Sequence, residues 1–122
     1  MHNLLDTAYK RGLQGESVAL AFLKQSGYDI LRQRYKTPYG EIDVVAQLGQ
    51  MIVCVEVKTR RTLSASLYAV QHKQQERIMN AYLYFIQSCP QYADYPVRFD
   101  VIVCAPNTKP IHLQHAFEST YE

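Results

Sequence analysis

The stretches Gly40-Glu41-Ile42-Asp43 and Val55-Glu56-Val57-Lys58 decide how this chain folds, because they place acids and a lysine inside sequence typical of β-strands. Segment 41–59 is otherwise rich in Val and Ile, and Gly49 stands where a turn is needed. The segment therefore predicts a β-hairpin. Charged side chains within strands are costly to bury, so these residues call for a chemical role.

The expected hairpin register predicts which of these side chains meet. A turn centred on Leu48-Gly49 places Asp43 opposite Cys54 and diagonal to Glu56. Diagonal neighbours on one face lie about 7–8 Å apart, close enough for two carboxylates to share a small cation. Alternation puts Glu56 and Lys58 on the same face. The opposite face, directed into a core, receives Val53, Val55 and Val57.

Glu41 is a further candidate in this register. It lies opposite Glu56, so spacing alone leaves open whether Glu41 or Asp43 is the ligand. A position at the entry of the strand also suits a surface residue. A slip of one residue would reverse both faces of the hairpin.

The segment before the hairpin predicts a helix over about 8–26, followed by Gly27 as its stop. Ala19, Leu20 and Leu23 recur at helical spacing, and Glu16 stands on the same face. A carboxylate on a core-facing stripe must find a cation or hydrogen-bond donors. Glu16 is thus the fourth residue expected to converge on the site.

The remaining elements follow from the same kind of pattern. Residues 28–36 predict a strand, 37–40 a turn and 59–66 a polar, basic loop at the mouth of the site. A second helix is predicted from about 70 to 89, then a strand over 97–103 and an edge strand over 111–117. A crossover through the second helix makes its flanking strands parallel. The order αβββαβ(β) predicts a three-layer α/β fold, a central mixed sheet flanked by helices.

Composition sets outer limits on the protein. A chain of 122 residues is expected to form a single domain, 1–122, with a core that needs neither metal nor disulfide to fold. Its three cysteines are odd in number and widely spaced, which predicts reduced thiols in a cytoplasmic protein. No apolar run approaches the roughly 18 residues of a membrane span, so no membrane partner is expected.

The distribution of basic residues points to a nucleic-acid partner more than the net charge of +2 does. Basic side chains flank the expected site from three segments, and they suit contacts to backbone phosphates. They are Arg32, Arg34 and Lys36 before the hairpin, Arg60 and Arg61 after it, and Lys73 and Arg77 on the second helix. Tyr35, Tyr39 and Tyr68 are candidates for stacking on unpaired bases. Asp100 is expected to be structural, paired with Arg98 or a helix end.

The convergent residues fit the chemistry of phosphodiester hydrolysis. A hard cation can activate water and stabilise charge on the nonbridging oxygens. Mg²⁺, or Mn²⁺ in its place, is satisfied by two carboxylates together with substrate phosphate and water. Asp43 and Glu56 suit the two ligands, and Glu16 suits a metal-bound water or a second cation. Lys58 is expected to stay protonated among the carboxylates and to stabilise developing charge.

The element order, with Glu16 in the first helix, Asp43 on the second strand and Glu56-x-Lys58 on the third, resembles the PD-(D/E)XK nuclease superfamily. More closely, residues 11–104 resemble the YraN family of small bacterial proteins. The matching stretches are Gly15-Glu16, Gly27-Tyr28, Gly40-Glu41-Ile42-Asp43, Val55-Glu56-Val57-Lys58-Thr59-Arg60, Arg77-Ile78 and Arg98-Phe99-Asp100-Val101. Archaeal Holliday-junction resolvases are a more distant likeness. The resemblance implies a restriction-endonuclease-like fold and the carbonyl of Val57 as a further metal ligand.

These residues together predict a metal-dependent nuclease acting on DNA in repair or recombination, with branched and single-stranded DNA as candidate substrates. The alternative is a catalytically silent, nuclease-like module that binds nucleic acid or serves as a scaffold. A structural subunit without a nucleic-acid role leaves the acids inside strands unexplained. The sequence does not distinguish DNA from RNA or one metal from two, and it leaves the oligomeric state open, with a homodimer among the options.

Overall fold

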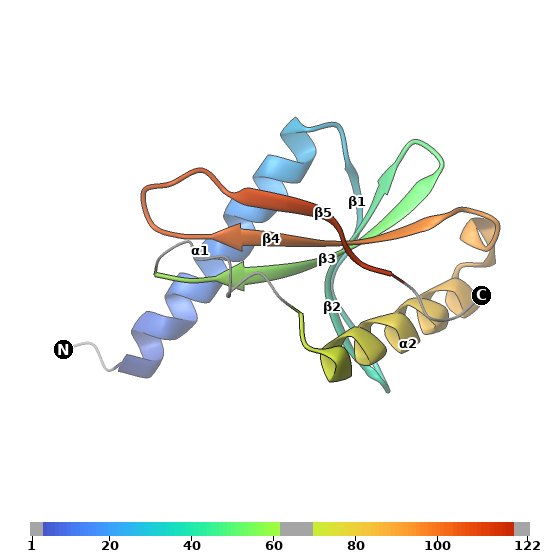
Figure 1. Cartoon of the computed structure of the whole chain (residues 1–122), viewed down its shortest axis with the longest axis horizontal. Helices are drawn as coiled ribbons and strands as arrows, with labels where there is room; N and C mark the ends of the chain where they lie inside the picture. Colours follow the sequence, from blue (N-terminus) through green and yellow to red (C-terminus); the bar gives the residue numbers. More distant parts are fainter. Residues whose placement is uncertain (1–3, 62–69, 119–122) are drawn as a thin grey trace.

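The computed structural model describes residues 4–61 and 70–118 of the chain (Figure 1). Its elements are α1 (Leu4–Gln25), β1 (Asp29–Thr37), β2 (Gly40–Leu48), β3 (Met51–Thr59), α2 (His72–Ser88), the short 3₁₀ helix η2 (Pro90–Tyr92), β4 (Val97–Cys104) and β5 (Ile111–Phe117). The strands form one sheet in the order β1-β2-β3-β4-β5. Only β3 and β4 pair in parallel, so the sheet in the described part of the chain is mixed, as the crossover through α2 predicts.

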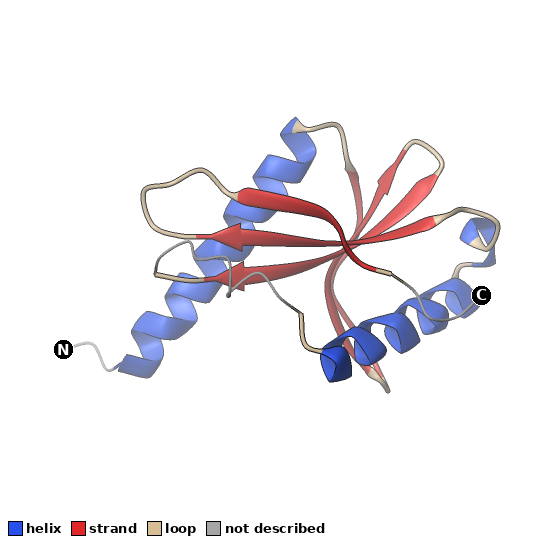
Figure 2. Cartoon of the chain, in the orientation of Figure 1, coloured by secondary structure: helices blue, strands red, loops and turns tan. Residues whose placement is uncertain are grey.

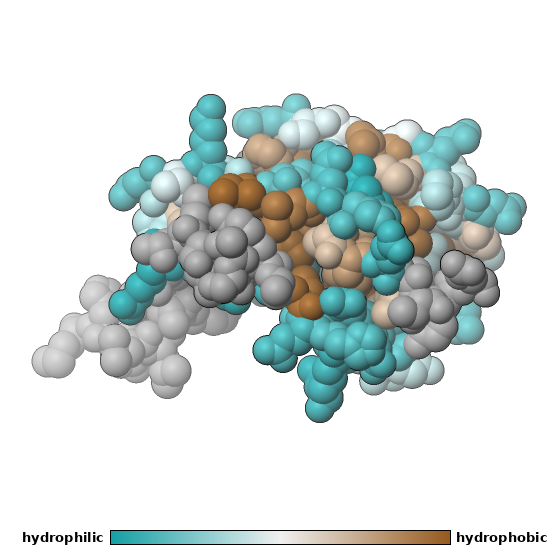
Figure 3. Space-filling view, viewed as in Figure 1, coloured by the Kyte–Doolittle hydropathy of each residue, from teal (hydrophilic) through white to brown (hydrophobic). Residues whose placement is uncertain are grey.

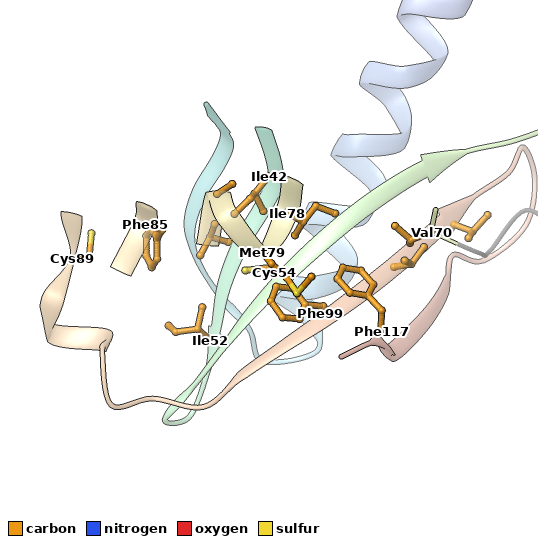
Figure 4. Close-up of a cluster of buried hydrophobic side chains, with 14 residues drawn as sticks. Ile42, Ile52, Cys54, Val70, Ile78, Met79, Phe85, Cys89, Phe99 and Phe117 are labelled. Carbon is orange, nitrogen blue, oxygen red and sulfur yellow. The ribbon is translucent and has the colours of Figure 1, made fainter. Parts of the chain in front are cut away.

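The two long helices pack on opposite sides of this sheet (Figure 2). Residues of α1 such as Ala19 and Leu23 join Val53 and Val55 in one buried cluster. The other cluster contains Ile78, Met79 and Phe85 of α2 with Ile42, Cys54 and Phe99 of the sheet (Figure 4). Because both faces of the central strands are buried, their sequences are nearly continuous runs of apolar residues. The predicted three-layer α/β architecture is confirmed.

The hairpin turn differs from the prediction by one position, and this changes the pairing. Leu48 pairs with Met51, so Gly49 and Gln50 are the two turn residues, with Gly49 at a φ of 59°. Val45, rather than Asp43, therefore lies opposite Cys54. The predicted register was wrong by two residues. An even shift leaves every side chain on its predicted face, because side chains alternate with a period of two.

Strands β2 and β3 pair along only part of their length. Their ladder runs from the turn to Val44 and Val55, whereas β2 begins at Gly40 and β3 continues to Thr59. Beyond Val44 and Val55 the strands diverge, β2 curving down toward α2 while β3 continues beside β4 (Figure 1). We call this divergence the fork. The acids of the strand sequences stand at the fork, where no continuous ladder has to accommodate them.

Strand β1 departs from the regular alternation that its sequence predicts. Its register against β2 shifts between Ile30 and Arg32, which marks a β-bulge. Arg32 consequently lies on the α2 side, with its guanidinium carbon 5.7 Å from the centre of the Phe85 ring. Arg34, which has a positive φ of 47°, contacts α1 instead. The bulge precedes both arginines, so the irregular backbone at Arg34 itself is what directs the two side chains to different helices.

A buried charge network joins β4 to β5. Asp100 is fully buried and accepts hydrogen bonds from Arg98 at 2.8 and 2.9 Å, and its Oδ2 lies 2.7 Å from Nε2 of His112. Arg98 also donates to the Tyr28 hydroxyl at 2.6 Å. Burial alone would raise the pKa of Asp100, but the hydrogen bonds from His112 and Arg98 outweigh it and lower that pKa. The predicted pairing of Asp100 with Arg98 is confirmed.

Two further expectations concern cysteines and membranes. Cys54, Cys89 and Cys104 are all buried free thiols, as predicted. Within the described ranges, neither α1 nor any other helix is long and apolar enough to cross a membrane.

Candidate active site

Asp43 and Glu56 face each other across the fork. They follow directly on the Val44–Val55 pair, which closes the β2–β3 ladder. The Oδ2 atom of Asp43 accepts a hydrogen bond of 2.8 Å from the backbone N–H of Val57. Val57 pairs with Ile102 on β4, and at the fork the Asp43 side chain takes the place of its missing partner on β2. This bond fixes the Asp43 carboxyl group beside β3.

The two carboxyl groups interact strongly with each other. Burial raises the pKa of Asp43 to about 6 against the lowering effect of the Val57 hydrogen bond, with the charges of Glu16 and Glu41 adding to the rise. Burial raises the pKa of Glu56 to about 8, and the charge of Asp43 adds to it. Near neutral pH the pair therefore retains a proton.

The donor set of this pair fits a hard divalent cation. Two adjacent carboxyl groups that hold a proton between them offer the oxygen ligands that Mg²⁺ and Mn²⁺ prefer. A cation bound there would replace the proton and remove the repulsion that raises both pKa values.

Gln74, in the first turn of α2, holds the other side of Glu56. Its Nε2 donates a hydrogen bond of 2.8 Å to Oε1 of Glu56. The sequence had not predicted a functional role for Gln74. The available signal was a polar residue at helical spacing with Ile78 and Ala81, which both lie buried in the core. A glutamine on such a face needs a polar partner, and Glu56 provides it.

A cavity of about 300 Å³ opens at this point of the molecule. It is lined by Gly40, Glu41, Asp43, Glu56, Gln74, Arg77 and Ile78. Since liquid water occupies about 30 Å³ per molecule, the volume suffices for a hydrated cation beside a phosphate group. In the observed register Asp43, and not Glu41, lies opposite Glu56. Glu41 still lines the cavity, so it stays a candidate ligand. Arg77 contributes the positive charge that a phosphate group requires.

Lys58 lies two residues beyond Glu56 on β3 and is 9% exposed. Burial lowers the pKa of its ammonium group, the charge of Arg60 lowers it further, and the charge of Glu56 opposes both effects. The carboxylates, which are visible in the sequence, favour the charged ammonium form of Lys58. Desolvation, which the sequence does not report, acts in the opposite direction and is the larger effect.

Glu16 on α1 forms an ion pair with Arg34, which supplies the positive charge that the position of Glu16 was predicted to need. The guanidinium group of Arg34 contacts Oε2 of Glu16 through both Nε at 2.7 Å and Nη2 at 2.6 Å. Glu16 also raises the pKa of Asp43 through its charge, although burial is the main cause of that rise. Arg34, predicted to contact nucleic acid, is thus bound to a predicted catalytic residue.

Among the other residues predicted to contact nucleic acid, Arg77 lines the cavity, and Lys36 and Lys73 are neighbours of the lining residues Glu41 and Gln74. Lys36, Arg61, Lys73 and Arg77 are exposed, whereas Arg60 donates to the carbonyl of Thr59 at 2.8 Å. Hydrophilic side chains gather at the lower edge of the molecule, over the start of α2 (Figure 3).

The three predicted stacking tyrosines have different environments. Tyr39 is 55% exposed on the turn between β1 and β2. Tyr35 is partly buried, and its ring packs edge-on against Phe85 at 5.5 Å. It is therefore a core residue. Tyr68 lies outside the described residues.

Residues 15–104 match the model of the uncharacterised protein family UPF0102. The chain belongs to this family. UPF0102 proteins from Nitrobacter winogradskyi and Rhodopseudomonas palustris strain BisB5 are each 44% identical to it over 113 residues. The alignments cover 93% of this chain, with 96% of the Nitrobacter protein and 86% of the Rhodopseudomonas protein. The resemblance to the YraN family, which is the UPF0102 family, is confirmed.

The fold is similar to that of Hjc from Archaeoglobus fulgidus, a Holliday junction resolvase from an archaeal hyperthermophile. The superposition has a TM-score of 0.54, covers 81% of this chain and 72% of Hjc, and the sequences are 20% identical. At this identity the likeness concerns the fold. It confirms the nuclease-like, restriction-endonuclease-type architecture.

Proposed function

We propose that this protein is a metal-dependent nuclease that hydrolyses phosphodiester bonds in DNA. The observation that carries the proposal is the pairing of Asp43 with Glu56 at the fork, beside a cavity that also presents Gln74 and Arg77. Two carboxyl groups that are buried side by side both lose hydration, so a purely structural role rarely explains such a pair. A site for a divalent cation accounts for the arrangement, and the resolvase-like fold supports it.

The proposed roles follow from position and charge. Asp43 and Glu56 would hold Mg²⁺ or Mn²⁺, with the Val57 carbonyl and Glu16 as further ligands. When bound, the cation would supply an activated water and charge stabilisation at the phosphate. Lys58 would stabilise negative charge that develops on the phosphate oxygens. The basic residues around the cavity would hold backbone phosphates. They are Arg34, Lys36, Arg60, Arg61, Lys73 and Arg77.

The decisive experiment is a cleavage screen with Mg²⁺ or Mn²⁺ over branched, flapped, single-stranded and duplex DNA, with RNA counterparts. Asp43→Asn and Lys58→Met are expected to reduce cleavage at least about 100-fold while the fold persists. The first removes a proposed metal ligand, and the second removes a positive charge that would stabilise the reacting phosphate. Glu118→Gln is the matched control, since its carboxylate is exposed and contacts His115 rather than the cavity. Equal activity in all three variants would refute the proposal.

A catalytically silent binding module is the second candidate. The contact between Arg34 and Glu16 favours it, because it occupies one of the predicted catalytic carboxylates. Salt-dependent DNA binding with no turnover on any substrate would support this alternative.

We also propose a single nuclease-like domain over residues 1–122 and a cytoplasmic location, where buried thiols stay reduced. A homodimer is tested by light scattering of the full chain with and without DNA.

A further inference from the structure

We infer that the ion pair between Glu16 and Arg34 is exchangeable and couples the binding of a backbone phosphate to the binding of a divalent cation. In the free protein Arg34 holds Glu16. When a nucleic-acid phosphate takes the guanidinium group, Glu16 is released to the cation site. The inference rests on the proposed nuclease function and adds a mode of regulation to that same site.

The sheet register places Arg34 next to the proposed metal ligands. Arg34 lies between Gln33, which pairs with Val44, and Tyr35, which pairs with Ile42. Asp43 is therefore its neighbour on β2, and Asp43 in turn faces Glu56 on β3. Arg34, Asp43 and Glu56 are neighbours across three strands, with the Arg34 side chain directed toward α1 and the carboxyl pair toward the cavity beside α2. A phosphate bound at Arg34 would therefore lie on the α1 side of the same fork.

The contact itself leaves Glu16 partly available. Two of the three guanidinium nitrogens, Nε and Nη2, contact the same oxygen, Oε2. The second carboxylate oxygen is not part of these two contacts. The charge of Glu16 also raises the pKa of Asp43. Arg34 therefore neutralises a charge that acts on the proposed cation site, and release of Glu16 would strengthen the attraction of that site for a cation.

The pair is weak enough to exchange. The side chains of Arg34 and Glu16 are 45% and 31% exposed. Ion pairs with this exposure typically contribute little to stability, because water competes for both charges. A phosphate group accepts two parallel hydrogen bonds from guanidinium and carries comparable charge, so it is an effective competitor.

The backbone at Arg34 indicates that fold stability is not the reason for this arginine. Its φ of 47° lies in the left-handed region, which glycine or asparagine occupies at lower cost. A residue held in this region stores backbone strain, and such strain often marks a position retained for function. Arginine at this position provides a guanidinium group on the α1 side of the fork.

The first test measures binding of Mn²⁺ alone by electron paramagnetic resonance, with no DNA present. Arg34→Ala is expected to tighten Mn²⁺ binding about fivefold, because it frees Glu16. Lys24→Ala removes one positive charge from the last turn of α1, away from the residues that line the cavity, and serves as the control, with an expected change below about twofold. In a Glu16→Gln background, Arg34→Ala is expected to produce no gain.

The second test measures the reciprocal effect on a fluorescent single-stranded oligonucleotide in EDTA. Glu16→Gln is expected to tighten oligonucleotide binding severalfold by releasing Arg34, and Arg34→Ala to weaken it. Thermodynamic linkage requires both signs if one pair connects the two ligands.

The outcomes separate the inference from the function on which it rests. If wild type binds Mn²⁺ and Arg34→Ala weakens that binding, or changes it no more than Lys24→Ala does, the coupling is refuted and the nuclease proposal stands. If none of the proteins binds Mn²⁺, the proposed function fails and the coupling with it.

Discussion

At the scale of single residues, the chemistry of the site depends on Glu56. This carboxyl group is fixed from one side by Gln74 and from the other by its neighbour Asp43. Its burial makes the charged form costly. The same burial that would favour a cation at the proposed site therefore makes the protein without metal sensitive to pH.

Glu56→Gln is expected to stabilise the metal-free protein at alkaline pH. The pKa of Glu56 rises from its ordinary value of 4.5 to about 8 in the fold, so between these values the folded state holds more protons than the unfolded chain. The free energy of unfolding then falls as pH rises through this window. At pH 9 the variant should exceed wild type by on the order of 2 kcal/mol, and at pH 4 the two should agree. Urea unfolding in EDTA measures both, and parallel pH profiles would contradict the expectation.

Elements could be predicted from the sequence more reliably than their exact pairing. Hydrophobic periodicity gave both helices and all five strands of the described chain, because burial on both sheet faces imposes it. The turn was harder, since Gly49 marks a turn without indicating which of its positions the glycine takes. The resulting shift by two residues left Asp43, Glu56 and Lys58 on their predicted faces. It changed which residues lie opposite each other, since Val45 and not Asp43 pairs with Cys54.

Two features of the site could not be assigned from the sequence. The bulge at Leu31 and the positive φ at Arg34 break the alternation of β1, and neither Leu nor Arg is typical of such a position, so the different environments of Arg32 and Arg34 were not predictable. Gln74 is a single polar residue on a helix, and its function depends on where Glu56 lies after folding. Both depend on tertiary contacts, which local patterns do not report.

The first turn of α2 is expected to position Glu56 through Gln74. Gln74→Ala should reduce cleavage about tenfold and weaken Mn²⁺ binding, because Glu56 loses the donor that orients it. Gln74→Glu should be more damaging, since it adds a third carboxylate next to Glu56. Gln71→Ala is the matched control, because the Gln71 side chain makes no capping hydrogen bond at the start of α2. The assignment fails if Gln74→Ala and Gln71→Ala give the same Mn²⁺ affinity.

At the scale of the whole molecule, two polar centres have different tasks. The site at the fork has raised carboxyl pKa values and opens to a cavity. The network of Asp100, Arg98 and His112 is closed, fully satisfied and has a lowered carboxyl pKa. The raised pKa values at the fork fit the proposed cation site, whose ligands would give up a proton on binding. The lowered pKa of Asp100 fits a carboxylate that stays charged and holds two strands together.

Asp100→Asn is accordingly expected to destabilise the fold by about 3 kcal/mol or more, because it leaves the positive charge of Arg98 buried without its partner. Urea unfolding at pH 7 measures this loss. Glu118→Gln, which alters an exposed carboxylate of the same region, should change stability by less than about 0.5 kcal/mol. Where Asp100→Asn remains folded, its Mn²⁺ affinity should match wild type. Equal free energies of unfolding for the two variants would refute the structural role of Asp100.

The surface that faces substrate can be mapped with a single tryptophan, since the chain contains none. Tyr39 is exposed beside the cavity residue Gly40, and its turn is held by Thr37, whose Oγ1 accepts hydrogen bonds from both their N–H groups. A ring held in place at this point suits stacking on an unpaired base. In EDTA, single-stranded DNA should therefore quench the emission of Tyr39→Trp more strongly than duplex DNA of equal length. Val18→Trp, on the outer surface of α1 at a residue 44% exposed, should show little quenching by either. Equal quenching of the two tryptophans, or of Tyr39→Trp by both forms of DNA, would exclude a stacking role for this turn.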